Sequence, residues 1–107
     1  MSNKIIFEIQ AELCRSLGNP LRMEIMDLLR DGQLSVGDIA SAVNHPQPAI
    51  SRNLAALRNV GIVVAQREGN RVLYHIANPK LMHVCDLMRE VLTEQIDEKS
   101  RMTKRKE

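Results

Sequence analysis

The spacing of apolar residues predicts two helices in the first part of the chain. Apolar side chains recur every three or four positions from Ile5 to Leu17, and a second stripe follows Pro20 and stops at Asp31-Gly32. This is the period of a helix with one buried face. Pro20 suits a first helical turn, and Gly32 suits a left-handed cap after a helix. The chain therefore begins with a tight helical pair.

The next stretch predicts two shorter helices joined by a tight turn. Ser35 is a good N-cap for a helix of about two turns that ends at Asn44-His45. After Pro46, the residues Ile50, Leu54 and Leu57 mark the buried face of another helix, which runs to Gly61. A short helix, a turn and a second helix together predict a helix-turn-helix.

The second half of the chain predicts a hairpin and a closing helix. The β-rich runs 62–65 and 72–76 flank a polar stretch with Gly69-Asn70 at its centre, which predicts a β-hairpin. Asn78-Pro79 then opens a long helix with an apolar seam that reaches Ile96. The predicted fold class is mainly α with a small β-hairpin. Residues 1–98 form the domain, and 99–107 form a disordered basic tail.

Composition narrows the class of protein. With 107 residues, 44% of them hydrophobic and 2% aromatic, the chain can build one modest aliphatic core. The sequence contains no run of about 18 apolar residues, so no membrane span is predicted. Charged residues interrupt the N-terminal stretch too early for a signal peptide. We therefore expect a cytoplasmic protein without a membrane partner. Its two cysteines, Cys14 and Cys85, are expected to be reduced.

The distribution of charge is more informative than its sum of +2. Between residues 46 and 72, Glu68 is the single acidic residue, whereas the same stretch holds four arginines, Arg52, Arg58, Arg67 and Arg71. A local excess of cations over a helix and a hairpin tip favours a nucleic-acid partner.

Four segments in this order carry a resemblance to a known family. They are Leu17-Gly18-Asn19-Pro20-Leu21-Arg22, Leu34-Ser35-Val36-Gly37-Asp38-Ile39-Ala40, Gln47-Pro48-Ala49-Ile50-Ser51-Arg52-Asn53-Leu54 and Arg67-Glu68-Gly69-Asn70-Arg71-Val72-Leu73-Tyr74. From about residue 8 to 96 the chain resembles the ArsR/SmtB family of bacterial transcriptional regulators. The resemblance implies a winged helix-turn-helix, dimeric through its first and last helices. It also implies binding to an operator in double-stranded DNA, repression of transcription, and release by an inducer.

The outward side of the fourth helix is the predicted reading surface. With Ile50, Leu54 and Leu57 turned inward, this side is small except for Arg52, so it can enter a major groove about 12 Å wide. Similarity to the family makes Gln47, Ser51 and Arg52 the readers of bases and phosphates. The DNA-binding residues predicted on this helix are Gln47, Pro48, Ser51, Arg52, Asn53 and Arg58. Asn53 stands where the family commonly has a His.

Two further surfaces are predicted. At the hairpin tip, Arg67, Asn70 and Arg71 are suited to phosphates or to a narrow minor groove. The first and last helices carry more apolar surface than a domain of this size needs, so we expect them to pack against the same pair in a second chain. The predicted dimer residues are Ile5, Ile9, Leu13, Leu81, Val84, Cys85, Met88 and Leu92.

A metal or cofactor is not expected. The family's cysteine motif would need Cys at Ser35 and Gly37, and its zinc site on the last helix would align with Asn78, Lys80, Val91 and Glu94, which leaves one carboxylate. A new site from His83, Cys85, Asp86 and Glu90 is disfavoured because Cys85 lies on the apolar seam.

Cys14 and Cys85 are the candidate thiol sensor, since both lie on the helices expected to form the dimer. Oxidation, persulfide formation or a crosslink there would shift the angle between two recognition helices. A plain hydrophobic role for both is the alternative. A metal-responsive regulator and an effector-independent winged helix also stay open.

Other classes of protein are less well supported. No phosphate-binding glycine loop, catalytic triad or paired carboxylate site is evident, so an enzyme is not expected. An architectural DNA binder or a protein-interaction module would have the same fold. A regulator differs from both in binding one DNA sequence in preference to others.

Overall fold

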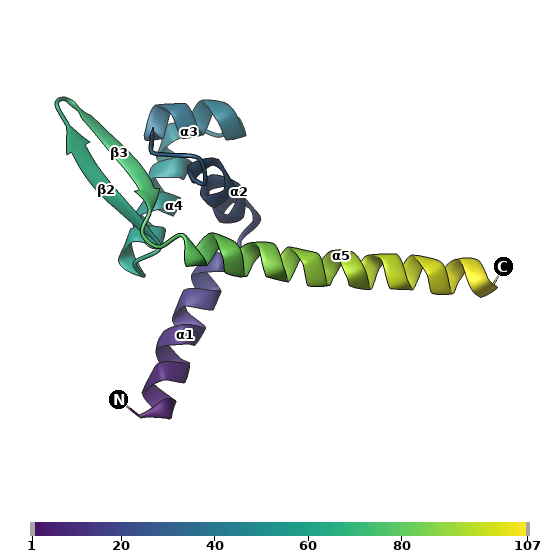
Figure 1. Cartoon of the computed structure of the whole chain (residues 1–107). Helices are drawn as coiled ribbons and strands as arrows, with labels where there is room; N and C mark the ends of the chain where they lie inside the picture. Colours follow the sequence, from purple (N-terminus) through teal and green to yellow (C-terminus); the bar gives the residue numbers. More distant parts are fainter. Residues whose placement is uncertain (1, 107) are drawn as a thin grey trace.

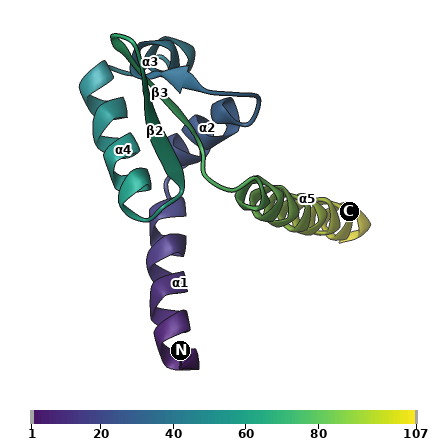
Figure 2. The ribbon, with the colours of Figure 1, turned by 60° about the vertical axis from the view of Figure 1, so that its left-hand side comes forward.

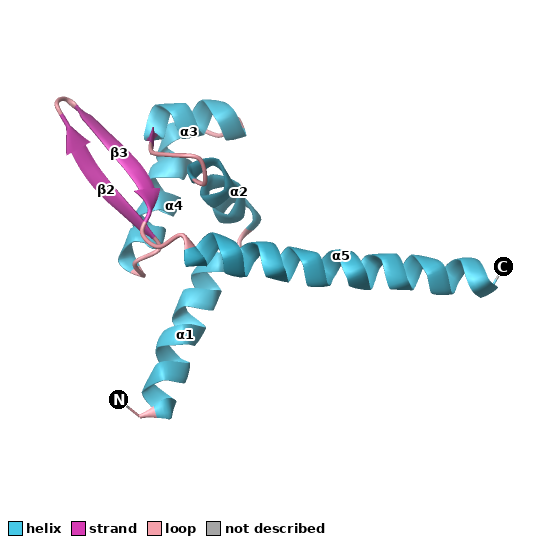
Figure 3. Cartoon of the chain, viewed as in Figure 1, coloured by secondary structure: helices cyan, strands magenta, loops and turns pink. Residues whose placement is uncertain are grey.

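A computed structural model describes residues 2–106 and confirms the predicted order of helices and hairpin. Figures 1 and 3 show a small domain of helices and one hairpin, from which the first and last helices project. The elements are α1 (Asn3–Leu17), α2 (Pro20–Leu29), β1 (Leu34–Ser35), α3 (Val36–Val43), α4 (Gln47–Asn59), β2 (Val63–Glu68), β3 (Arg71–Ile76) and α5 (Lys80–Lys106).

Local capping explains where the helices begin and end. The Asn19 side chain accepts from the Arg22 amide at the start of α2, and the Ser35 hydroxyl accepts from the Asp38 amide at the start of α3. Each cap satisfies a donor that the first helical turn leaves free. Asn44 ends α3 in the left-handed conformation, with a φ of 56°. The predicted N-cap and end of this helix are thus confirmed.

The sheet has one strand more than the sequence predicted. β1 pairs antiparallel with β3, which gives the order β1-β3-β2, and Leu34 lies opposite Tyr74. A two-residue strand has no periodicity of its own, which is why the pattern of apolar residues did not reveal it. The predicted hairpin is confirmed, with Glu68 opposite Arg71 and Gly69 at a φ of 61° in the turn between them.

The core lies between α2, α3, α4 and the base of the hairpin. Ile50, Leu54 and Leu57 are each fully buried, so the inner side of α4 is the one the sequence predicted. Figure 2 shows α4 beside the hairpin, with α2 and α3 behind them. The core is aliphatic, and its buried hydrophobic members are Ile25, Met26, Leu29, Ile39, Ala40, Ile50, Leu54, Leu57, Ile62, Val63, Leu73 and Met82.

The helices α1 and α5 leave much of their apolar surface exposed. They extend from the domain in different directions (Figure 1). Ile9 on α1 is 59% exposed, and Met88 on α5 is 51% exposed. Several further apolar side chains on each of these helices are also exposed. So much exposed apolar surface is uncommon on a monomeric protein.

The end of α5 differs from its prediction. Disorder was expected over residues 99–107, but α5 continues as helix to Lys106, and Glu107 lies outside the described residues. The stretch after Lys99 contains no Gly or Pro and has several good helix formers, so a helix that is already nucleated can extend through it.

A charged cluster fastens α5 to α2. The Arg30 guanidinium donates to both carboxylate oxygens of Asp86, at 2.7 and 2.8 Å, and to Asp27 at 3.0 Å. The hydrogen bonds from Arg30 lower the pKa of Asp86 below the ordinary carboxyl value. The pair therefore favours the folded chain at neutral pH.

Asp86→Asn is expected to make thermal stability less sensitive to acid. The contribution of the pair is present at neutral pH and is lost as the pH falls through the lowered pKa of Asp86, so the variant has less to lose. The effect is small because both side chains remain in contact with solvent. Melting followed from neutral to acidic pH tests this, with Asp31→Asn as a charge-matched control. Equal acid sensitivity in the wild type and Asp86→Asn would contradict it.

Candidate nucleic-acid interface

The outward side of α4 presents most of the residues predicted to read DNA. Gln47, Pro48, Ser51, Arg52 and Arg58 are all exposed. Pro46 and Pro48 bracket the first residue of the helix, and proline at this place costs no hydrogen bond. The fully buried side chains behind this surface hold the helix against the core. The result is a slim ridge with two cations, Arg52 near its middle and Arg58 near its end.

Asn53 occupies a different position from the other predicted readers. It is half-buried, its Oδ1 accepts from Nε of Arg22 at 2.9 Å, and its Nδ2 donates to the Ala49 carbonyl at 2.8 Å. Its amide is therefore engaged within the domain rather than directed outward. Arg22 is not among the residues predicted for the site, although it ends the segment Leu17-Gly18-Asn19-Pro20-Leu21-Arg22, which carries part of the family resemblance.

The hairpin tip carries the second group of predicted residues. Arg67, Asn70 and Arg71 are exposed. Nη2 of Arg71 lies 3.3 Å from Oδ2 of Asp38 at the start of α3, so its charge is partly balanced within the chain. Among residues 2–106, no carboxylate forms an ion pair with Arg67. Arg67 is the better placed of the two cations to meet a phosphate.

The two cysteines line one cavity. This apolar space of about 190 Å³ lies between the end of α1, α2 and the first turns of α5. Cys14 is exposed and Cys85 is half-buried. Burial, and next the charge of Asp86, raise the pKa of the Cys85 thiol, while Arg89 and Arg30 oppose the shift. The other side chains at the cavity are mainly aliphatic and include Met23, Met26, Met82 and Met88.

Metal-binding groups are not brought together in the part of the chain that the structure describes. No three His, Cys, Asp or Glu side chains there lie close enough to share an ion. Asp86, one of the residues weighed for such a site, is engaged by Arg30. No helix in the same residues has the length and apolarity needed to cross a membrane.

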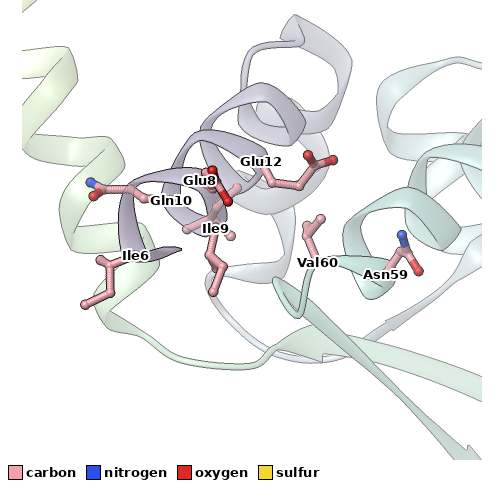
Figure 4. Close-up of a pocket in the computed structure, with 8 residues that line it drawn as sticks. Ile6, Glu8, Ile9, Gln10, Glu12, Asn59 and Val60 are labelled. Carbon is pink, nitrogen blue, oxygen red and sulfur yellow. The ribbon is translucent and has the colours of Figure 1, made fainter. Parts of the chain in front are cut away.

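An open hollow of about 920 Å³ lies beside α1 (Figure 4). Ile6, Ile9 and Leu13 of α1 contribute its apolar side, and Val60, just after α4, lies across from them. Glu8, Gln10, Glu12 and Asn59 supply a polar margin. An apolar floor with a polar margin is the composition of a protein-protein contact surface.

Comparison with known proteins identifies the domain. Residues 19–64 match the family described as bacterial regulatory protein, arsR family. The chain is 31% identical over 100 residues to the HTH-type transcriptional regulator Rv0081 of Mycobacterium tuberculosis, covering 92% of this chain and 88% of the relative. It is 37% identical over 79 residues to the transcriptional repressor SmtB of the same species, covering 74% of this chain and 58% of SmtB.

Solved structures agree with this similarity. The crystal structure of Rv0081 superimposes with a TM-score of 0.81 at 32% identity, covering 88% of this chain and 95% of that one. The homodimeric winged helix-turn-helix DNA-binding domain of Mb0332 from Mycobacterium bovis gives a TM-score of 0.82 at 32% identity, covering 92% and 93%. These relatives are transcriptional regulators rather than enzymes. The chain belongs to the ArsR family of winged helix-turn-helix, DNA-binding transcriptional regulators.

Proposed function

We propose that the protein is a cytoplasmic homodimer that binds an operator in double-stranded DNA, represses transcription there and is released by an inducer. The observation that carries this proposal is the outward side of α4. Gln47, Ser51 and Arg52 are exposed on it, while the opposite side of the same helix is anchored by fully buried side chains. A rigid helix with a slim outer side is what a major groove admits.

Two copies are needed for useful specificity. One short helix reads only a few base pairs, whereas a twofold dimer reads two half-sites about 34 Å apart. We assign the dimer contact to α1 and α5 because both helices expose apolar residues, and Ile6 and Ile9 of α1 also line the hollow beside that helix. The partner's own α1 and α5 would cover this surface, because a twofold contact uses the same patch on both chains. The homodimeric form of the Mb0332 domain supports this assignment.

A gel shift on the DNA upstream of the protein's own gene and its neighbours tests the proposal. Discrimination of one sequence over unrelated DNA, with a steep salt dependence, is the expected result. Salt-dependent binding without discrimination would instead indicate an architectural DNA binder, because phosphate contacts alone carry no sequence information. Absence of binding would indicate a protein-interaction module.

The hairpin is proposed to contact phosphates through Arg67. Arg67→Ala is expected to weaken binding to operator and unrelated DNA by a similar factor, and to lower the salt slope by about one. Arg71→Ala should have less effect, because Asp38 already balances part of that charge. Affinities measured over a series of salt concentrations check both variants. A selective loss of operator binding in Arg67→Ala would show base reading instead.

We propose that the inducer is a compound that reacts with cysteine thiols. Cys14 and Cys85 line the same cavity between α1, α2 and α5, so one modification would bear on both helices assigned to the dimer. Peroxide would remove two electrons and two protons from the thiol pair as a disulfide forms, and would itself be reduced to water. A polysulfide could instead transfer one sulfur atom to a single thiolate, which forms a persulfide and releases a polysulfide shorter by one sulfur atom.

The two cysteines should react at different rates. Cys14 is exposed, whereas the raised pKa of Cys85 leaves a smaller fraction of reactive thiolate at neutral pH. Alkylation followed by mass spectrometry is expected to modify Cys14 first, and to modify Cys85 increasingly as the pH rises. Faster reaction of Cys85 at neutral pH would contradict this.

Cys14→Ser and Cys85→Ser then test the inducer itself. Peroxide or polysulfide should release the wild type from its operator and should fail to release at least one variant. Added divalent metals provide the comparison. Release of the operator by metals alone would indicate a metal-responsive regulator rather than a thiol-responsive one. Insensitivity of the wild type to every addition would leave an effector-independent regulator.

A further inference from the structure

Arg22, near the start of α2, joins three helices. Its Nε donates to Oδ1 of Asn53 in α4 at 2.9 Å, and its Nη1 donates to the Ser16 carbonyl near the end of α1 at 3.3 Å. The Arg22 amide donates to Oδ1 of Asn19, the cap of α2, at 3.2 Å. A planar guanidinium offers several donors in a fixed arrangement, so these bonds restrain direction as well as distance.

Asn53 is the point at which this network reaches the reading helix. Its Nδ2 donates to the Ala49 carbonyl one turn earlier, while its Oδ1 accepts from Arg22. Both ends of the side-chain amide are therefore used, and the side chain has one orientation. Asn53 directly follows Ser51 and Arg52 in the chain. A restraint on Asn53 is a restraint on the backbone that carries both exposed readers.

The core alone does not provide this restraint. Ile50, Leu54 and Leu57 hold the inner side of α4 by apolar burial, which is strong but has little directional preference. A small rotation or shift of α4 would keep these residues buried. The same motion would move the outward side chains relative to base edges, where hydrogen bonds tolerate little misalignment. Directional bonds from a neighbouring helix supply what apolar packing lacks.

We propose that Arg22 and Asn53 are a positioning pair that sets the rotation of α4 and thereby the sequence discrimination of the protein, without contact to DNA. This inference rests on the proposed reading role of α4. Asn53 was grouped with the DNA-binding residues on the basis of sequence, and the structure assigns it this internal role.

Two measurements on four variants test the pair. Arg22→Met, Asn53→Ala and the double variant break it. Arg101→Met is the matched control, because it removes the same charge from an exposed residue at the far end of α5. Each pair variant is expected to lower the ratio of operator to unrelated-DNA affinity about tenfold, the scale of one poorly read base pair. The double variant should lose no more than the worse single one, since both remove one interaction.

The affinity for unrelated DNA and the salt slope should stay at their wild-type values in the pair variants. Arg101→Met should keep the wild-type ratio. A salt slope lowered by about one in Arg22→Met would show that Arg22 touches a phosphate directly, and would overturn the proposal. Additive losses in the double variant would also overturn it.

Amide hydrogen exchange in the DNA-free protein separates this inference from the proposed function. The amides of α4 should exchange faster in Arg22→Met and Asn53→Ala, and at the wild-type rate in Arg101→Met. Unchanged exchange in the pair variants would rule out a positioning role. If the wild-type protein showed no sequence discrimination, the proposed function would fail, and the exchange comparison would still decide whether the pair holds α4.

Discussion

Met88→Glu is expected to turn the protein into a monomer that no longer holds an operator. Met88 is 51% exposed on α5, within the apolar surface assigned to the dimer, so glutamate can be accommodated in a single chain. In a twofold contact the substitution places a charge on both sides of an apolar interface, and burial of such a charge is strongly unfavourable. Operator affinity should fall at least about a hundredfold, because one half-site provides only part of the specific contacts.

Size-exclusion chromatography with light scattering, followed by a gel shift, measures this result. Ile9→Glu on α1 should behave in the same way, since Ile9 belongs to the other helix of the assigned contact. Glu90→Lys is the control, because a residue two positions from Met88 points about 200° away around the helix. A dimer that persists in both Met88→Glu and Ile9→Glu would place the contact elsewhere.

Arg52→Ala is expected to cost about 1–3 kcal/mol of operator affinity, the range of one good contact between a side chain and a base. Arg52 is the cation near the middle of the outward side of α4, and its neighbours there are small or polar. Arg52→Lys keeps the charge but lacks the planar group that bonds a base through two donors. It should therefore retain affinity for unrelated DNA and lose operator discrimination.

Fluorescence anisotropy with operator and unrelated DNA, each over a range of salt concentrations, measures both variants. Arg101→Ala removes the same charge from the far end of α5 and serves as the control. If Arg52→Ala left operator affinity and its salt slope unchanged, Arg52 would be an ordinary exposed arginine, and α4 would have to read DNA without it.

The buried side of α4 could be predicted from sequence, whereas its hydrogen-bonded partners could not. Ile50, Leu54 and Leu57 repeat at helical spacing, so burial of one of them implies burial of all three. The bond between Arg22 and Asn53 spans 31 positions of the chain, and no periodic pattern reports such a pairing. The Ser35 cap could be predicted because capping is local. β1 could not, because its two residues show no periodicity and its partner, β3, lies far along the chain.

In the hairpin and at the cysteines, too, local features could be predicted from the sequence, whereas contacts between elements could not. Exposure of Arg67 and Arg71 could be anticipated from a polar turn, but the contact between Arg71 and Asp38 depends on how the hairpin folds over α3. Cys14 and Cys85 are predicted together as a candidate sensor because both lie on the helices expected to form the dimer, but the sequence does not show that they share a cavity. Their common cavity exists only because α1 and α5 both meet α2. Sequence patterns describe one element at a time, and the meeting of elements is a property of the fold.

Hydroxyl-radical footprinting of the protein on its operator is the most direct test of the central claim, that two copies of α4 enter the same face of one DNA duplex. The account predicts two protected segments centred about one helical turn, or 34 Å, apart, with one dimer bound and both segments lost together in Met88→Glu. One protected segment occupied by a single chain, or uniform protection without sequence preference, would contradict it.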